Sequence, residues 1–248
     1  MSHAVVVAHP DDEALWLSAA LAGAKSVILC FGAPFGQAEK AESRRRAVAE
    51  LPLSNIVNLA IPESGVHKLV DWANPELTPT GMAIRDPAGQ RRYDDNFARL
   101  TAALAPLLQG VEDVYTHNAW GEYGHPEHVQ VHRVIAALQK NFRFTLRFSN
   151  YVGPASFALA RQLGAQPCWR EKRIVQPDVQ LAKRLRGVYQ RHGVWTWSRL
   201  HRWPREEVYY AQPAGAAASG RDLSGETLID ITALRWWRRP QAALRRLP

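Results

Sequence analysis

The stretch AVVVAHPDDE, residues 4–13, decides the expected fold. Its first four residues are small or β-branched and apolar, which is typical of a buried strand, and a helix-forming segment follows at residues 13–21. Between the strand and the helix lie His9 and the carboxylates of residues 11–13. This cluster is therefore expected in the turn after the carboxyl end of a strand, where open parallel α/β sheets bind their ligands.

The same order of strand, loop and helix recurs along the chain. We expect further strands at 25–31, 55–61, 111–116, 143–149 and 206–211, and helices at 39–51, 94–108 and 129–140. The three arginines at 44–46 are interpreted as part of a solvated helix face. The turn-rich residues 63–90 are expected to form a substrate-facing rim. Together these patterns predict a sheet built from βαβ units.

The composition indicates a folded protein with one main domain. Its 248 residues are 46% hydrophobic, which is enough for a substantial core. The two cysteines cannot form a disulfide framework, and no apolar stretch is long enough to cross a membrane, so we expect a cytoplasmic protein. We expect the main domain at residues 1–213 and a linker with a basic, Trp/Arg-rich tail at residues 214–248.

The formal net charge of +8 is unevenly distributed, because residues 170–205 carry most of the excess of basic side chains. Residues 181–203 mix basic side chains with interleaved aromatic ones, as in surfaces that bind anionic partners. A phosphate-bearing sugar or a lipid headgroup is the preferred partner, and nucleic acid is less favoured. The WWRR sequence at 236–239 is compatible with an anionic membrane surface or with packing against the domain.

A second cluster of polar residues, HNAWGEYGHPEH at 117–128, follows the expected strand at 111–116. His9 and Asp12 can face one cation, and His128 can supply a third ligand from this second loop. Two nitrogens and one oxygen with an open fourth position are typical of a catalytic zinc, although iron or manganese would also fit. A rival ligand set is the pair His128 and His132, four residues apart on a helix. Asp11 would remain free to act as a base on a metal-activated water.

Residues 8–13, AHPDDE, together with residues 124–128, GHPEH, resemble the zinc-dependent de-N-acetylases of the PIG-L/LmbE-like family, which act largely on N-acetylglucosamine-type sugars. The resemblance implies a Rossmann-like three-layer α/β sandwich with a mostly parallel central sheet and the metal site at the carboxyl ends of its strands. It implies zinc on His9, Asp12 and His128 and a general base at Asp11. It also implies that His125 stabilises the oxyanion or protonates the leaving amine.

Two glutamates flank these residues. The family commonly has aspartate at the position of Glu127, whose carboxylate is expected to support His125. Glu13 is expected to orient the loop that carries the metal ligands, since outer carboxylates often fix metal-binding imidazoles. A favourable charge at the start of a helix is the alternative for Glu13.

The substrate contacts are expected in the second polar loop. Trp120 could stack on a sugar face, with core packing as the alternative, and His117 and Tyr123 could line the same pocket. The leading hypothesis is a hydrolase that removes an N-acetyl group from an amino sugar in a glycoconjugate or metabolite. The alternatives are an amidase for another N-acylated metabolite and a non-catalytic protein that binds through its basic surface. The presence of Asp11 argues against the last, because a binding module needs no base beside its metal.

Overall fold

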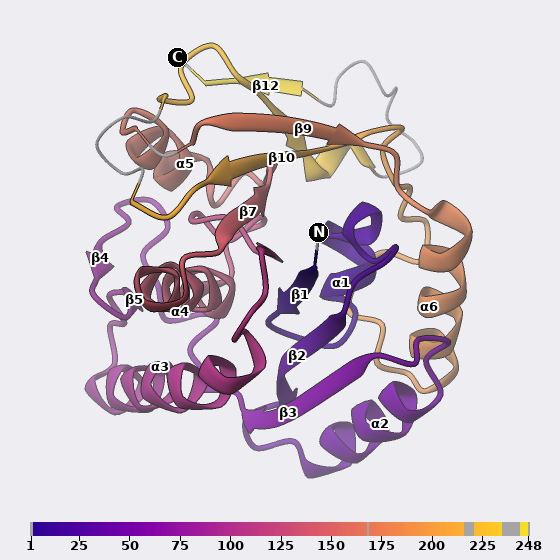
Figure 1. The fold of residues 1–248 in the computed structure, drawn as a ribbon. Helices are drawn as coiled ribbons and strands as arrows, with labels where there is room; N and C mark the ends of the chain where they lie inside the picture. Colours follow the sequence, from indigo (N-terminus) through magenta and orange to yellow (C-terminus); the bar gives the residue numbers. More distant parts are fainter. Residues whose placement is uncertain (1, 168, 216–220, 235–243, 248) are drawn as a thin grey trace.

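The computed structural model describes residues 2–167, 169–215, 221–234 and 244–247 (Figure 1). Its centre is a seven-stranded sheet in the order β3-β2-β1-β6-β7-β10-β9. The five strands from β3 to β7 are parallel, and β10 runs antiparallel to both β7 and β9. These strands are β1 (His3–Val7), β2 (Ser26–Ala33), β3 (Ile56–Pro62), β6 (Asp113–Thr116), β7 (Thr145–Ser149), β9 (Glu171–Val175) and β10 (Glu207–Gln212).

Helices cover both faces of this sheet, so the fold has three layers. Alternate residues of β1 point to opposite faces: Ala4 and Val6 belong to the core under α3 and α4, whereas Val5 and Val7 belong to the core under α1, α2 and α6. The mostly parallel three-layer α/β fold is therefore confirmed. The helices are α1 (Asp12–Trp16), α2 (Ala38–Ala49), α3 (Pro87–Leu107), α4 (Pro126–Phe142), α5 (Phe157–Gly164) and α6 (Val179–Arg191).

The strand order places a topological switch point beside β1. The chain moves outward from β1 to β2 and β3, and then returns to the other side of β1 as β6. Loops that leave β1 and β6 therefore turn away from each other and open a crevice at the carboxyl ends of these strands. Both polar clusters of the sequence occupy these two loops.

The first helix is shorter than expected. The structure has α1 at Asp12–Trp16 and a separate 3₁₀ turn, η1, at Ser18–Ala20, in place of one helix through residue 21. The buried carboxylate of Glu207 on β10 accepts hydrogen bonds from the Ser18 hydroxyl at 2.5 Å and from the Ala19 backbone N–H at 3.0 Å. This contact takes a backbone donor that a continuous helix would use, so a tertiary interaction overrides the local helix preference.

The stretch from residue 63 to residue 90 contains a short hairpin and the start of α3. The hairpin consists of β4 (Leu77–Thr78) and β5 (Gly81–Met82), which pair antiparallel. α3 begins within this stretch, at Pro87, where Asp86 caps the helix by accepting a hydrogen bond from the Gly89 N–H at 2.6 Å.

A second, three-stranded sheet joins the later part of the chain to the middle of it. It consists of β8 (Tyr151–Val152), β11 (Thr227–Asp230) and β12 (Leu244–Arg246), and a 3₁₀ turn, η2 (Ile231–Leu234), follows β11. Leu228 and Leu247 are buried in the same core as Ala4 and Val6 of β1. Residues 216–220 of the expected linker and the WWRR sequence at 236–239 lie outside the described residues, and the division at residue 213 stays a prediction. Among the described helices, none has the length and apolar character needed to cross a membrane.

Candidate metal centre

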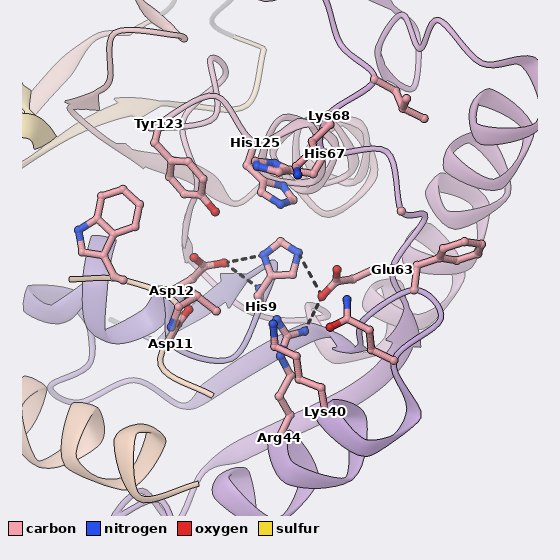
Figure 2. A pocket seen from close by; sticks show the side chains of 16 residues that line it. His9, Asp11, Asp12, Lys40, Arg44, Glu63, His67, Lys68, Tyr123 and His125 are labelled. Atoms are coloured by element: carbon pink, nitrogen blue, oxygen red, sulfur yellow. Dashed lines mark hydrogen bonds and ion pairs between the residues drawn. The ribbon is translucent and has the colours of Figure 1, made fainter. Parts of the chain in front are cut away.

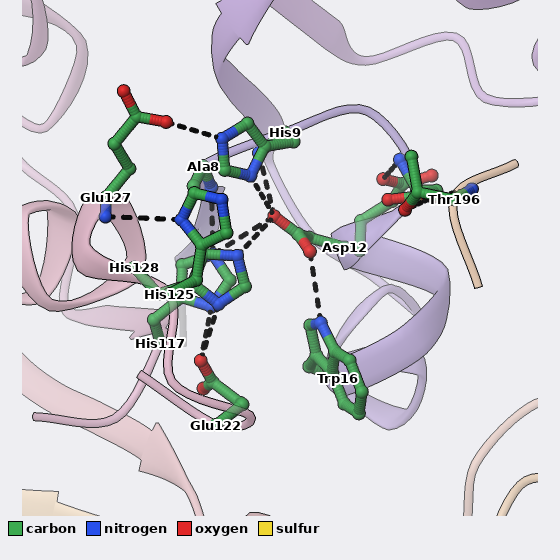
Figure 3. A network of polar contacts seen from close by, with 12 residues as sticks. Ala8, His9, Asp12, Trp16, His117, Glu122, His125, Glu127, His128 and Thr196 are labelled. Atoms are coloured by element: carbon green, nitrogen blue, oxygen red, sulfur yellow. Dashed lines mark hydrogen bonds and ion pairs between the residues drawn. The ribbon is translucent and has the colours of Figure 1, made fainter. Parts of the chain in front are cut away.

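The loops after β1 and β6 bring the three predicted metal ligands together at the switch point (Figure 3). The Asp12 Oδ2 atom lies 3.1 Å from His9 Nδ1 and 3.2 Å from His128 Nε2. Atoms bound at about 2.0–2.1 Å to one tetrahedral zinc ion are separated by about 3.3 Å, so the two spacings from Asp12 are compatible with a shared ion. His9 and His128 also form a possible metal-binding group with His125. Coordination of a metal by His9, Asp12 and His128 remains a prediction.

The hydrogen bonding of these side chains also fits a cation. His128 Nε2 is completely buried and has no hydrogen-bond partner, although it faces the Asp12 carboxylate. A buried nitrogen with a free lone pair is costly unless a ligand uses it. Burial opposes ionisation of Asp12, but interactions with His128, His117 and His9 hold its pKa well below the usual value. The ionised carboxylate and the free imidazole nitrogen therefore favour a divalent cation over an empty apolar cavity.

The two histidines of the predicted ligand set are each oriented by a buried glutamate. Glu122 Oε2 lies 2.7 Å from His128 Nδ1, and Glu127 Oε2 lies 2.9 Å from His9 Nε2. A proton on each of these two nitrogens leaves His128 Nε2 and His9 Nδ1, the atoms that face Asp12, free to bind a metal. Such carboxylate–histidine pairs commonly fix the ring and the tautomer of metal-binding histidines.

Glu127 therefore supports a different residue from the one expected. Its carboxylate contacts His9 and accepts hydrogen bonds from the Ser64 N–H and hydroxyl, both at 2.7 Å, whereas His125 receives only the Glu127 backbone N–H at 3.3 Å. The reason is that His125 caps the N-terminus of α4, so its ring turns back toward the helix. The Glu127 side chain, on the first turn, points across to the β1 loop instead (Figure 3).

His117 lies behind the predicted ligands and does not line the pocket. Its Nε2 accepts a hydrogen bond from the Ala8 N–H at 2.8 Å, its Nδ1 lies 3.1 Å from Glu122 Oε2, and its ring stacks on His128 at 3.8 Å between centroids. Asp12, His117 and His128 lie close enough together to hold a metal, and His117 Nε2 is 3.5 Å from Asp12 Oδ2, but the hydrogen bond from Ala8 already uses the lone pair of this nitrogen. The expected substrate contact by His117 is corrected to a supporting position behind His128.

We predict that Glu122→Gln weakens zinc binding by about 10- to 100-fold, as the loss of an outer carboxylate commonly does. Glu122 is fully buried, and despite that burial its contacts with His117 and His128 lower its pKa to about 2. An amide would keep the shape but lose the charge that orients both rings. Competition with a fluorescent zinc chelator measures the affinity. Glu171→Gln, an exposed change on β9, is the matched control, and equal affinities for the two variants would contradict the supporting role of Glu122.

His132, the rival ligand, is turned away from this centre. Its Nδ1 lies 2.8 Å from the His117 backbone oxygen, and its ring packs edge-on against Phe148. Burial lowers the pKa of His132 to about 4, so it is neutral at ordinary pH. The geometry therefore favours the ligand set built on Asp12 over a pair formed by His128 and His132.

Asp11 stands beside the predicted ligands without joining them. Its backbone is left-handed, with φ 100°, which separates its side chain from that of Asp12. Its Oδ2 accepts hydrogen bonds from Thr196, and its N–H donates to Glu13 Oε2 at 3.1 Å. Burial and the neighbouring charge of Asp12 raise the pKa of Asp11 to about 7. Glu13 thus contacts the backbone of Asp11, as a residue that orients this loop would. The Tyr189 hydroxyl donates to the other carboxylate oxygen of Glu13, Oε1, at 2.8 Å.

His125 faces the same space with a neutral ring. Burial, together with the nearby His9, His128 and His67, lowers the pKa of His125 well below its usual value. Since His125 Nδ1 accepts the Glu127 N–H, the proton of the neutral ring belongs on Nε2. His125 therefore presents an N–H donor beside the predicted metal ligands, as a residue that stabilises an oxyanion should.

A pocket of about 670 Å³ opens over this centre (Figure 2). His9, Asp11, Asp12 and His125 form its base, and Tyr123 lines one side as expected. Trp120 does not line it. Only 1% of the Trp120 surface is exposed, and its Nε1 donates to the Tyr151 backbone oxygen at 2.7 Å. The expected sugar contact is therefore corrected to core packing, the alternative that the sequence left open.

The pocket is also lined by residues that the sequence did not predict. Lys40 and Arg44 reach it from α2, and Lys68 reaches it from the loop after β3, beside His67 and His125 (Figure 2). Arg44 is buried and ion-paired with Glu63, so it is not part of a solvated helix face. The spacing of Lys40 and Arg44, one helical turn apart directly after a strand and its loop, was the available signal. From the basic segment 181–203, only Thr196 and Trp197 line this pocket.

The fold and site define an α/β protein with a candidate metal centre at a sheet switch point. The family model described as "PIG-L: GlcNAc-PI de-N-acetylase" matches residues 4–138, more than half of the 248 residues, and the chain belongs to this family. It is 32% identical over 149 residues to the 1D-myo-inositol 2-acetamido-2-deoxy-alpha-D-glucopyranoside deacetylase of Mycolicibacterium vanbaalenii. The match covers 53% of this chain and 52% of that protein, so the chain spans about half the length of this curated relative.

Solved structures of deacetylases share the fold. The zinc-inhibited form of teicoplanin deacetylase superimposes with a TM-score of 0.55 at 15% identity, and a deacetylase–teicoplanin complex with 0.54 at 13% identity. Each match covers 87% of this chain and 99% of the other. At these identities the likeness concerns the fold, which extends well beyond the residues that the family model matches.

Proposed function

We propose that this protein is a metal-dependent hydrolase that removes the N-acetyl group from an N-acetylglucosamine-type amino sugar. The observation that carries the proposal is a buried carboxylate, Asp11, that lines the pocket beside Asp12 without sharing its contacts with His9 and His128. Such an arrangement suits a base that acts on water next to a metal. Membership of the PIG-L family and the deacetylase activity named for the Mycolicibacterium relative support the choice of substrate.

His9, Asp12 and His128 would hold the metal, with zinc preferred and iron or manganese as alternatives. When bound, such an ion polarises an amide carbonyl and makes water more acidic. The remaining steps belong to the side chains of this chain. Asp11, with its pKa raised to about 7, would accept a proton from the attacking water near neutral pH. The His125 Nε2–H would donate to the oxygen of the acetyl carbonyl as negative charge develops on it.

Release of the amine requires a proton on its nitrogen. Asp11 is protonated after it has acted as base, and it lies at the base of the same pocket, so it can return the proton to the leaving amine. The products would be acetate and a free amino sugar. Acetate release from N-acetylglucosamine derivatives by metal-reconstituted protein tests this function. Turnover of other N-acyl amides but not of acetylated sugars would favour the amidase alternative, and no turnover in either group would favour a binding protein.

The charges of the pocket point to a substrate with an anionic group. Lys40 and Lys68 both line the pocket, and in the part of the chain that the structure describes neither is ion-paired with a carboxylate. Arg44 is already paired with Glu63. Two unpaired ammonium groups beside a site for a divalent cation favour a negatively charged ligand, such as a phosphate-bearing sugar, over a neutral one.

Lys40→Met tests this preference. We expect KM for a phosphate-bearing N-acetyl amino sugar to rise about tenfold and KM for the neutral sugar to change less than about twofold, since a contact with a charged group is typically worth about 1.5–3 kcal/mol. Methionine keeps the length and the apolar stem of lysine. Lys183→Met, on the exposed face of α6, is the matched control for the basic segment. A larger effect at Lys183 than at Lys40 would assign the anionic group to α6 instead.

A further inference from the structure

A residue from the later part of the chain contacts the proposed base. Thr196 lies in the loop after α6, well beyond the residues 4–138 that the family model matches. Its backbone N–H donates to Asp11 Oδ2 at 2.8 Å, and its hydroxyl donates to the same oxygen at 2.7 Å. The two residues are 185 positions apart in the sequence, and Thr196 lines the pocket next to Asp11.

Among the described residues, no hydrogen bond other than the two from Thr196 reaches the buried Asp11 carboxylate. It occupies the N-cap position of α1 but makes no side-chain capping hydrogen bond. Its backbone is held by Glu13, which in turn accepts a hydrogen bond from the Tyr189 hydroxyl of α6. The last torsion of an aspartate side chain is broad, with no deep minima, so the backbone contacts leave the plane of the carboxylate undefined. Two donors on one oxygen define that plane.

We propose that Thr196 is a positioning residue for the base. By occupying Oδ2 with two hydrogen bonds, it directs the other oxygen, Oδ1, to the water that attacks the acetyl group. This inference rests on the proposed function, because it assigns a task to the same site. The physical reason is that catalysis requires the reacting atoms to be held in one geometry, and displacements of about 1 Å cost up to about 100-fold in rate.

The chain contains a matched control for this pair. Thr232 in η2 donates to Asp230 Oδ1 through its N–H at 2.9 Å and its hydroxyl at 2.7 Å. The threonine therefore makes the same two hydrogen bonds to an aspartate, but Thr232 and Asp230 do not line the pocket. Thr232→Val therefore shows the structural cost of removing such a hydrogen bond at a position away from the pocket.

The experiment compares Thr196→Val, Thr196→Ser and Thr232→Val in the full-length, zinc-loaded protein, with acetate release from an N-acetyl amino sugar as the assay. Valine keeps the shape and the backbone N–H but removes the hydroxyl. We expect Thr196→Val to lower kcat about tenfold, with KM changed less than about twofold and the zinc content unchanged. Thr196→Ser should restore kcat, and Thr232→Val should leave it unchanged.

A second readout is independent of turnover. Crystal structures of the metal-free wild type and of Thr196→Val should show the Asp11 carboxylate in one orientation in the wild type and rotated or spread over several in the variant. An unchanged Asp11 orientation or an unchanged kcat in Thr196→Val would overturn the proposal, and so would a serine variant as slow as the valine variant. If the wild type releases no acetate from any amino sugar, the proposed function fails, whereas the structures still decide whether Thr196 positions Asp11.

Discussion

Asp11→Asn is expected to lower kcat for acetate release by about 10³-fold while zinc stays bound. A general base commonly contributes about 10²- to 10⁴-fold to a rate, and the amide cannot accept the proton of the attacking water. Asparagine is the right replacement because it tolerates the left-handed backbone of Asp11, at φ 100°, better than alanine does. Its side-chain oxygen can still accept the two hydrogen bonds from Thr196, so the loop should keep its conformation.

The measurement pairs steady-state kinetics with the zinc content of the same sample. Asp222→Asn is the control, since Asp222 is exposed and, among the described residues, its side chain accepts one hydrogen bond, from the Ser224 N–H within its own turn. We expect this control to match the wild type in both quantities. If Asp11→Asn kept more than about a tenth of the wild-type kcat, the base would have to be another residue. If it lost zinc, Asp11 would belong to the metal ligands.

The sequence was most informative where a short segment determines its own environment. The apolar residues 4–7 have no polar face, so they fit only a strand buried on both sides, as β1 is. His9 and Asp12 are separated by a single tight turn, so their proximity follows from local geometry, and the His9 N–H confirms it by donating to Asp12 Oδ2 at 2.8 Å. The chemistry of this turn could be predicted because no distant residue is needed to form it.

Other elements depend on contacts that no local pattern contains. β9, Glu171–Val175, is charged and largely exposed at one edge of the sheet, and only its pairing with β10 makes it a strand. The family resemblance implies that the carboxylate of Glu127 supports His125, yet the direction of the first turn of α4 brings this carboxylate to His9. The run of arginines at 44–46 is typical of a solvated helix face, and only the ion pair with Glu63, on another loop, explains the burial of Arg44.

The most remote part of the site was the least predictable. Thr196 follows α6 in a segment whose basic and aromatic composition indicated an anionic partner, and nothing in that composition points to Asp11. Its contact with Asp11 depends on the way α6 packs against α1, where the Tyr189 hydroxyl reaches Glu13. The sequence therefore predicts candidate metal ligands and a candidate base, but not the remote residue that contacts the base.

His128→Asn is expected to abolish stoichiometric zinc binding and to lower acetate release by more than about 100-fold. Loss of a residue that only supports a metal ligand typically lowers affinity or activity by at most about 100-fold. Asparagine is chosen because its amide N–H₂ can replace His128 Nδ1 as the donor to Glu122, which avoids leaving that buried carboxylate without a partner. The change removes Nε2, the buried nitrogen that faces Asp12 and has no hydrogen-bond partner. Loss of zinc would therefore report on the imidazole ring that carries Nε2.

The control for this change is His132→Asn, one turn further along α4. Its amide can likewise replace His132 Nδ1 in the contact with the His117 backbone oxygen, so both variants keep one donor and lose one ring nitrogen. Zinc titrations by calorimetry should give wild-type stoichiometry for His132→Asn and none for His128→Asn. If both variants lost the metal, the histidine pair on α4 would be the ligand set. If neither did, the ion would bind away from Asp12, and the assignment of Asp11 as the base beside it would fall as well.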